Sequence, residues 1–145
     1  MDLEITRASK RRGFACALCA ALTACGQADD SDPYPIDAPR VVETVPADGD
    51  VQVDAELTEI TATFNETMHP GGWSWVTEAG LSAPVVTGFP FYIDDTTAVL
   101  PVRLLPDTLY VLWVNSPHDA ELRKFADEDG LAAPAHRIRF QTLPN

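Results

Sequence analysis

Short apolar runs with two-residue alternation fill most of the chain from Arg40 onward, and this pattern limits the fold more than any other feature. Residues 59–65 show it well, because Ile60, Ala62 and Phe64 fall on one side of an extended chain and the threonines between them fall on the other. Turn-forming residues separate such runs, roughly every eight to fifteen positions. Helical periodicity is nearly absent here. The pattern predicts half-buried antiparallel strands and an all-β fold.

The alternating runs give about seven short strands over roughly 105 residues. In the run 96–104, every second residue from Ala98 to Leu104 is apolar. Pro101 interrupts this run and lacks an amide hydrogen, so the strand is predicted at a sheet edge or at a bulge. The strands read directly from the sequence are 41–45, 59–65, 73–77, 96–104, 111–115 and 136–142.

The most specific fold signal is the pattern Leu-x-Pro-x-Thr-x-Tyr from Leu104 to Tyr110. It is typical of a tyrosine corner, in which the phenol of the tyrosine bonds to backbone a few residues upstream at the end of a β-sandwich. With about seven strands, this pattern predicts an Ig-like antiparallel β-sandwich over residues 39–145.

The segment before Cys25 has the features of a secretory signal. A basic cluster at residues 10–12 precedes an uncharged apolar run at 14–22, which is the usual order of such a signal. The run is about ten residues long, whereas a membrane-spanning helix needs about 20. Residues 1–24 are therefore predicted to be a cleaved signal peptide. Both the general secretory route and the twin-arginine route stay open, because the match to a twin-arginine signal is partial.

The sequence Leu22-Thr23-Ala24-Cys25 resembles the lipobox of bacterial lipoproteins. The resemblance implies that Cys25 is acylated with palmitate-type chains and becomes the new N-terminus. Each buried methylene contributes about 0.8 kcal/mol, so two or more chains hold a small domain on a membrane. The expected location is the bacterial cell envelope, at the periplasmic face or the cell surface. The outer membrane is favoured because Gly26, and not aspartate, follows the cysteine. The alternative is an ordinary cleaved signal without acylation.

The mature chain is expected to be strongly acidic. Removing the leader changes the formal net charge from −12 to −14, because the leader holds four basic and two acidic residues. Such a chain lacks the basic patch that nucleic-acid binding needs, so no nucleic-acid partner is expected. All three cysteines lie at or before Cys25, so no disulfide is expected within the domain. Residues 25–38 are acidic and contain prolines, which predicts an extended tether.

Several segments between Ala38 and Thr142 follow a known pattern: Ala38-Pro39-Arg40-Val41-Val42, Pro46-Ala47-Asp48-Gly49, Ile60-x-Ala62-x-Phe64 with Met68, the tyrosine-corner run, Asp129-Gly130 and Phe140-Gln141-Thr142. Together they resemble the bacterial Ig-like domains of S-layer proteins and other envelope proteins. The resemblance implies a structural or protein-interaction module without catalytic residues or cofactor. The expected partner, besides the membrane that holds Cys25, is another envelope protein or a cell-wall polymer.

Catalytic and metal-binding patterns are weak. Ser74 lacks the second glycine of a nucleophile elbow, and the three histidines lack the spacing of zinc ligands. The run 127–130 offers carboxylates before Gly130, but it lacks the distal glutamate of a calcium loop. A turn with this glycine at positive φ is the preferred interpretation, and calcium binding is the alternative. The sequence predicts a protein that is not an enzyme and holds no metal.

Three tryptophans make up the remaining candidate site. Trp73 and Trp75 are two residues apart and project to one side of their strand, whereas Trp113 is out of phase with the inward residues of its own strand. The preferred interpretation packs Trp73 or Trp75 in the sandwich core. The alternative is a surface platform in which Trp113 and one of the pair contact sugar rings or a partner, with Asn115 and Asp94 as polar neighbours.

Overall fold

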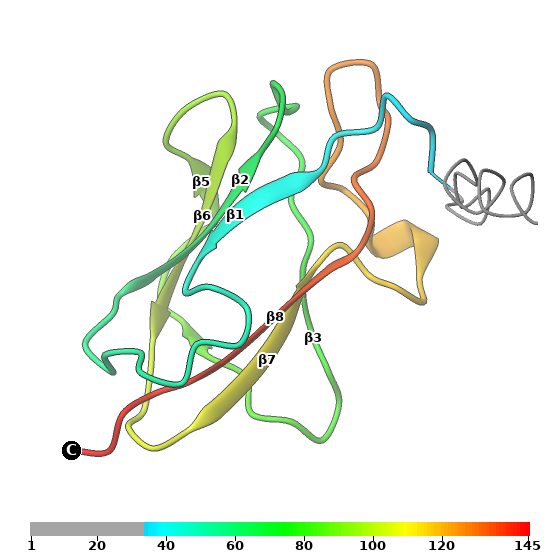
Figure 1. The fold of residues 1–145 in the computed structure, drawn as a ribbon. Coiled ribbons are helices and arrows are strands. Elements are labelled where there is room, and N and C mark those ends of the chain that lie inside the picture. The colour runs from blue at the N-terminus through cyan, green and yellow to red at the C-terminus, as the bar shows by residue number, and fades with distance from the viewer. Residues whose placement is uncertain (1–33) are drawn as a thin grey trace, which may run out of the picture. The chain divides into compact units, whose positions relative to one another are not determined.

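Residues 34–145 are described by the computed structural model, and they form an all-β domain (Figure 1). No helix in this part of the chain is long and apolar enough to cross a membrane. The predicted leader, Cys25 and the first residues of the predicted tether lie outside the described residues. The elements in chain order are β1 (Val41–Val45), β2 (Glu59–Phe64), β3 (Trp75–Thr77), β4 (Val85–Val86), β5 (Phe91–Tyr92), β6 (Thr97–Arg103), β7 (Leu109–Val114), the 3-10 helix η2 (Ala120–Leu122) and β8 (His136–Gln141).

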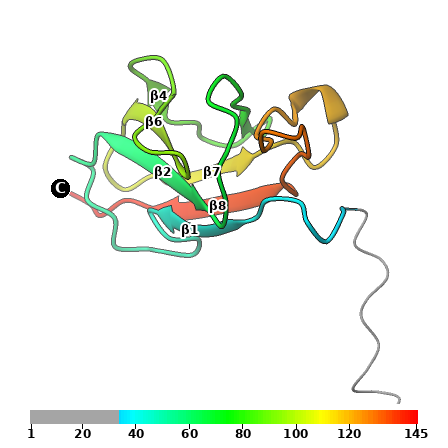
Figure 2. The same cartoon turned by 90° about the horizontal axis from the view of Figure 1, so that it is seen from above.

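The strands form two antiparallel sheets that stack as the layers of a sandwich (Figure 2). One sheet has the order β1-β2-β6-β4, and β5 also pairs with β6. The other sheet has the order β3-β7-β8. Each strand pair is antiparallel. The all-β sandwich expected from the alternation is therefore confirmed.

The core lies between the two sheets and is built from alternate residues of each strand. Ile60 and Phe64 of β2 and Ile138 and Phe140 of β8 are each at most 2% exposed. Their neighbours in sequence face outward, because successive side chains of a strand point to opposite faces. Phe125, from the loop between η2 and β8, is also fully buried and fills one end of this core.

Of the two positions expected for the strand that contains Pro101, a sheet edge or a bulge, the edge position is wrong. β6 lies inside its sheet, with β2 on one side and both β4 and β5 on the other. The proline is tolerated because β6 changes partner beside it: β5 pairs at Ala98 and Val99, whereas β4 pairs at Val102 and Arg103. The nitrogen of Pro101 points to the side where these short strands meet, so the missing amide donor falls where pairing changes from β5 to β4. Its carbonyl still accepts from the amide of Thr87 at 3.0 Å.

The predicted tyrosine corner is confirmed. The amide of Leu105 donates to the phenol oxygen of Tyr110 at 2.8 Å, and Tyr110 is almost fully buried. The tyrosine ring packs against Phe140, with 5.3 Å between ring centroids. Thr142 secures the same end of the sandwich, because its hydroxyl donates to the carbonyl of Leu105 at 2.6 Å.

One edge of β8 is covered by the segment that follows β1. The amide of Gly49 donates to the carbonyl of Arg139 at 2.6 Å, and the amide of Gln141 donates to the carbonyl of Asp50 at 2.8 Å. Val53 then forms a parallel bridge with Thr142. This cover links the two sheets and satisfies backbone groups that an open edge would leave unpaired.

The packed domain begins before Pro39. Ala38, which the sequence places in the tether, is 1% exposed, and its amide donates to the carbonyl of Pro35 at 3.0 Å. The ring of Tyr34 lies 5.6 Å from the guanidinium of Arg123. The last residues of the predicted tether therefore belong to the compact unit Tyr34–Asn145.

Candidate binding surface

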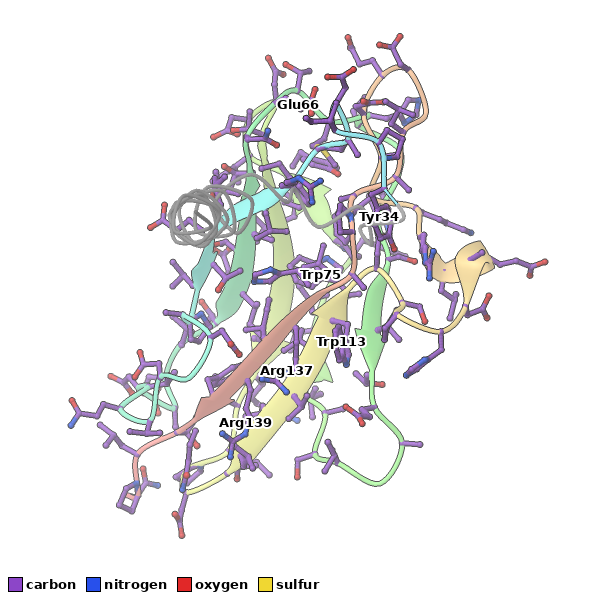
Figure 3. The ribbon with its side chains drawn as sticks, turned by 45° about the vertical axis from the view of Figure 1, so that its right-hand side comes forward. Tyr34, Glu66, Trp75, Trp113, Arg137 and Arg139 are labelled. Carbon is purple, nitrogen blue, oxygen red and sulfur yellow. The ribbon has the colours of Figure 1, made fainter. Side chains whose placement is uncertain are left out.

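The tryptophans of the candidate platform do not share one surface. Trp75 pairs across the strands with Val114, whereas Val76 pairs with Trp113. Because Val114 is fully buried, Trp75 lies on the inner face of the β3–β7–β8 sheet and Trp113 lies on its outer face (Figure 3). The register therefore does not bring Trp75 and Trp113 together.

The inner tryptophan packs against the core. The Trp75 ring meets the Phe125 ring edge to face, with centroids 5.4 Å apart and an interplanar angle of 89°. The Trp75 indole nitrogen is buried and has no hydrogen-bond partner. Trp73 is also partly buried against the same core cluster. Both positions agree with the packing interpretation of this pair.

Asn115 lies inside the domain, where its side chain bonds to backbone. Its Nδ2 donates to the carbonyls of Phe125 and Ala133 at 2.9 and 2.8 Å, and its Oδ1 accepts from the amide of Phe125 at 2.9 Å. The residue is fully buried, with a positive φ of 60°. Asparagine tolerates this left-handed conformation better than most residues. The surface contact expected of Asn115 is not available in this structure, because no part of its amide faces solvent.

Trp113 is the centre of an open face. It lies in the middle strand of its sheet, between Val76 of β3 and Arg137 of β8, and the next row pairs Val111 with Arg139. Figure 3 shows Trp113, Arg137 and Arg139 next to one another along β7 and β8. Both arginines are exposed, and neither guanidinium forms a hydrogen bond or an ion pair with a described residue. We call Val76, Trp113, Arg137 and Arg139 the outer platform.

A surface hollow of about 310 Å³ adjoins the outer platform at Trp113. One wall is the end of β3 with the residues after it, Val76–Ala79, and the other is Ser116–His118. Arg123 stabilises the second wall, because its Nε donates to the Ser116 carbonyl at 2.8 Å and its Nη2 to the Pro117 carbonyl at 3.2 Å. The Ser116 hydroxyl also accepts from two backbone amides of the same loop. Hydrogen bonds from the side chains of Arg123 and Ser116 therefore hold this second wall in place.

Asp94 lies in the other sheet, on the turn between β5 and β6. Its carboxylate accepts from the amide and the hydroxyl of Thr96 at 2.9 and 3.1 Å. The hydrogen bond from the Thr96 backbone is the main cause that lowers the pKa of Asp94. The carboxylate thus stabilises its own turn, and it is not a neighbour of Trp113 in the sheet.

A second exposed feature runs along β4, β5 and the loops beside them. The side chains of Phe89 and Ile93 are 91% and 62% exposed, and Val86 is 54% exposed. Residues 79–93 contain no charged side chain, although residues 34–145 have a formal net charge of −11. We call Val85, Val86, Phe89, Phe91 and Ile93 the apolar strip.

The family model described as "Bacterial Ig-like domain" matches residues 35–142 of this sequence. This match covers most of the chain. The chain belongs to the bacterial Ig-like domain family. A comparison with curated proteins finds no match.

Solved structures of an S-layer protein are similar to this Ig-like domain at low identity. The crystal structure of the S-layer protein rSbsC(31-844) matches with a TM-score of 0.44 and 13% identity over 92% of this chain. The N-terminal part of SbsC gives a TM-score of 0.45 and 14% identity over 91%, and SbsC domains 1-6 give 0.38 and 13% over 88%. This chain spans 16%, 27% and 15% of those three chains, respectively.

The histidines of the Ig-like domain lie apart and do not form a metal site. Among residues 34–145, no group of three or more histidine, cysteine, aspartate or glutamate side chains is placed to hold a metal ion. His69 is exposed, and its Nδ1 accepts from the amide of Gly71 at 3.1 Å. His118 is exposed beside the hollow. His136 is half-buried at the start of β8, and burial lowers its pKa while the charge of Asp48 acts in the opposite direction.

The acidic loop 127–130 of the Ig-like domain is a tight turn. The carboxylate of Asp127 accepts from the amide of Leu131 at 2.8 Å, and the amide of Gly130 donates to the Asp127 carbonyl at 3.2 Å. Gly130 has a φ of 86°, as the sequence predicts. Asp127 is thus buried and bonded within the turn, which leaves Glu128 and Asp129 as the exposed carboxylates of the loop.

Two features of the Ig-like domain were missed by reasoning from the sequence. The outward direction of Arg137 and Arg139 follows from alternation, but their position beside Trp113 depends on the register of β7 with β8. The apolar strip had a visible signal, since residues 79–93 form the longest uncharged stretch after Cys25. Exposure of its side chains, however, is a property of the fold and not of the sequence pattern.

Proposed function

We propose that this chain is an envelope-anchored lipoprotein whose bacterial Ig-like domain is a noncatalytic structural or protein-interaction module. Family membership supports the module, and the exposed apolar strip is the observation that carries its role in protein binding. Several large apolar side chains exposed along one segment of a surface favour an interaction site, because leaving them in water is unfavourable.

The apolar strip suits an apolar protein surface better than a polar one. The strip lies in an uncharged segment of an otherwise acidic domain, so a partner can approach it without burying an unpaired carboxylate. β4 and β5 have only two residues each. Pro84 and Pro90 lie within the same segment and lack amide donors. These prolines disfavour the addition of a partner strand, so the proposed contact is made by side chains.

The proposed anchor is an acyl group on Cys25. The lipobox resemblance supports it, together with the signal-like order of charged and apolar residues before the cysteine. Acylation would hold the domain at a membrane of the cell envelope, on the periplasmic face or at the cell surface, with the outer membrane favoured. There the apolar strip would be available to other envelope proteins.

Photo-crosslinking tests the proposed protein contact. A photoreactive amino acid replaces Phe89 in the full chain, and the same amino acid replaces Leu105, which is 59% exposed outside the strip, as a matched control. After illumination of intact membranes, mass spectrometry of protein and glycan should find one dominant protein adduct at position 89 and none at 105. V86D should remove the adduct. Identical adducts at both positions, or none at position 89, would contradict the proposal.

Fractionation of cells tests the proposed anchor. Cys25→Ser should abolish labelling with a palmitate analogue and move the protein from the membrane to the soluble fraction, because the acylated thiol is lost. Cys19→Ser is the matched control, since it removes a leader cysteine that the lipobox does not use. Membrane retention and labelling of the Cys25→Ser protein would show that the anchor is assigned wrongly.

A further inference from the structure

We propose that the outer platform binds a polysaccharide whose sugar rings carry carboxylate groups. This inference shares one assumption with the proposed function, namely that the domain is a noncatalytic binding module. It uses the β3–β7–β8 sheet, whereas the apolar strip lies along the opposite sheet, so the two surfaces can be tested separately.

Trp113 provides the flat apolar surface. Its indole is partly exposed at the centre of the three strands, with Val76 beside it on β3. The apolar face of a sugar ring can lie on an indole and remove both surfaces from water, and tryptophan presents the largest such surface of any side chain. Because β7 is the middle strand, the indole is held by strand pairing on both sides.

Arg137 and Arg139 supply the charge that a carboxylate requires. They are two residues apart on one face of β8, so their Cα atoms are about 7 Å apart along the strand. Neither guanidinium is engaged by a described residue, and a guanidinium binds a carboxylate through two parallel hydrogen bonds. Two of the six basic residues of 34–145 thus lie on the strand beside Trp113, Arg137 directly opposite it and Arg139 opposite Val111.

The hollow beyond Trp113 extends the platform to a further sugar unit. Its volume of about 310 Å³ is at the lower end of the range for small-molecule sites, about 300–1,000 Å³. The hollow is lined by the hydroxyl-bearing Thr77 and Ser116 and by the Glu78 carboxylate. The Glu78 carboxylate accepts hydrogen bonds from sugar hydroxyls but repels another carboxylate, so a sugar unit in the hollow presents its hydroxyls to Glu78 and directs its own carboxylate away from it. The carboxylate of the neighbouring unit then lies over the arginines.

The net charge of the domain gives no long-range attraction to any polyanion, the proposed ligand included. With a formal charge of −11, residues 34–145 repel carboxylated and sulfated polymers alike at long range. Binding of a carboxylated polysaccharide must therefore come from the local contacts with Trp113 and the arginines. Single substitutions of these residues should therefore lower the affinity for the polymer.

The test uses the full chain and three polymers. Polygalacturonate is the probe, fully methyl-esterified polygalacturonate has the same backbone without charge, and dextran sulfate is a polyanion without uronate rings. Calorimetry should show binding of polygalacturonate and at least tenfold weaker binding of the other two. Absence of polygalacturonate binding, or equal binding of dextran sulfate, would overturn the inference.

Substitutions test whether the polymer binds at the outer platform. W113A and R137Q should each weaken polygalacturonate binding at least tenfold, whereas W113F, which keeps an aromatic ring, should weaken it less. R103Q is the matched control. Arg103 is exposed on β6, and its guanidinium forms no hydrogen bond or ion pair with a described residue. Equal losses in R103Q and R137Q would show a net-charge effect and refute the site. If the unsubstituted protein does not bind polygalacturonate but still forms the Phe89 adduct, this inference is refuted and the proposed function is not.

Discussion

Asn115 shows how one polar residue can organise a core. Its amide joins the loop after β7 to the backbone at Phe125 and Ala133 through three hydrogen bonds in a fully buried position. A buried backbone group that loses its partner costs about 1–3 kcal/mol. Asn115 is therefore a structural residue, and its replacement should affect stability before any surface property.

Asn115→Ala should lower the free energy of unfolding by about 3 kcal/mol, because three backbone groups lose their partner. Asn65→Ala is the control, since the Asn65 side chain is exposed and accepts a single hydrogen bond from the amide of Arg40. We expect this control to lose about 1 kcal/mol or less. Urea unfolding measures both variants. A smaller loss in Asn115→Ala than in Asn65→Ala would contradict the assigned role.

His136 should make the stability of the domain depend on mildly acidic pH. Because burial lowers the pKa of the folded state below the ordinary value of about 6.5, the unfolded chain takes up this proton first as pH falls. The free energy of unfolding should therefore decrease from pH 7 to pH 5. His136→Gln should have a shallower decrease in urea unfolding than the unsubstituted protein. Equal slopes in the two proteins would refute the assignment.

At the scale of elements, the loop between β2 and β3 crosses close to the backbone of the loop before β8. A Cβ atom on Gly72 would collide with the carbonyl oxygen of Lys124. The Gly72 carbonyl also accepts from the phenol of Tyr92 at 3.0 Å, which attaches the loop to β5. Gly72 is therefore required by the close approach of two chain segments and not by an unusual φ.

Gly72→Ala should destabilise the domain by about 1–3 kcal/mol, the usual cost of forcing an extra atom into a packed site. Gly88→Ala is the matched control, because a Cβ there would meet the side chain of Pro101 at an ordinary distance of 3.5 Å. The control should change stability by about 0.5 kcal/mol or less. Thermal and urea unfolding compare the two variants. Equal losses of stability would show that Gly72 has room for a Cβ atom beside the Lys124 carbonyl.

At the scale of the whole molecule, the acidic charge opposes folding into a compact domain. Residues 34–145 hold seventeen acidic and six basic residues, and like charges repel more strongly when the chain is compact. Added salt screens this repulsion over a Debye length of about 10 Å at 0.1 M. The balance between core packing and charge repulsion should therefore depend on ionic strength.

The melting temperature should rise by a few degrees when NaCl is raised from low to moderate concentration, as expected for a gain of under about 1 kcal/mol. Choline chloride is the control, because it screens charge but does not occupy a cation site as sodium can. The same rise in both salts is expected, measured by differential scanning calorimetry. No rise, or a rise in NaCl alone, would contradict screening as the cause.

The sequence by itself determined which side chains are inside. Ile60, Phe64, Ile138 and Phe140 could be assigned to the core because alternation is local, so each assignment needs only the residues beside it. The tyrosine corner was predictable for the same reason, since Leu105 and Tyr110 are five residues apart.

The tertiary structure decided which strands are neighbours and which faces stay open. Pro101 was assigned to an edge or a bulge because the sequence could not show that two short strands share one side of β6. Asn115 was considered as a surface contact in the alternative interpretation, because its three backbone partners are ten and eighteen residues further along the chain. The outer platform likewise depends on the register that places Arg137 beside Trp113. These contacts join residues that are distant in sequence, and their pairing is set by the packing of the whole sandwich and not by any local preference.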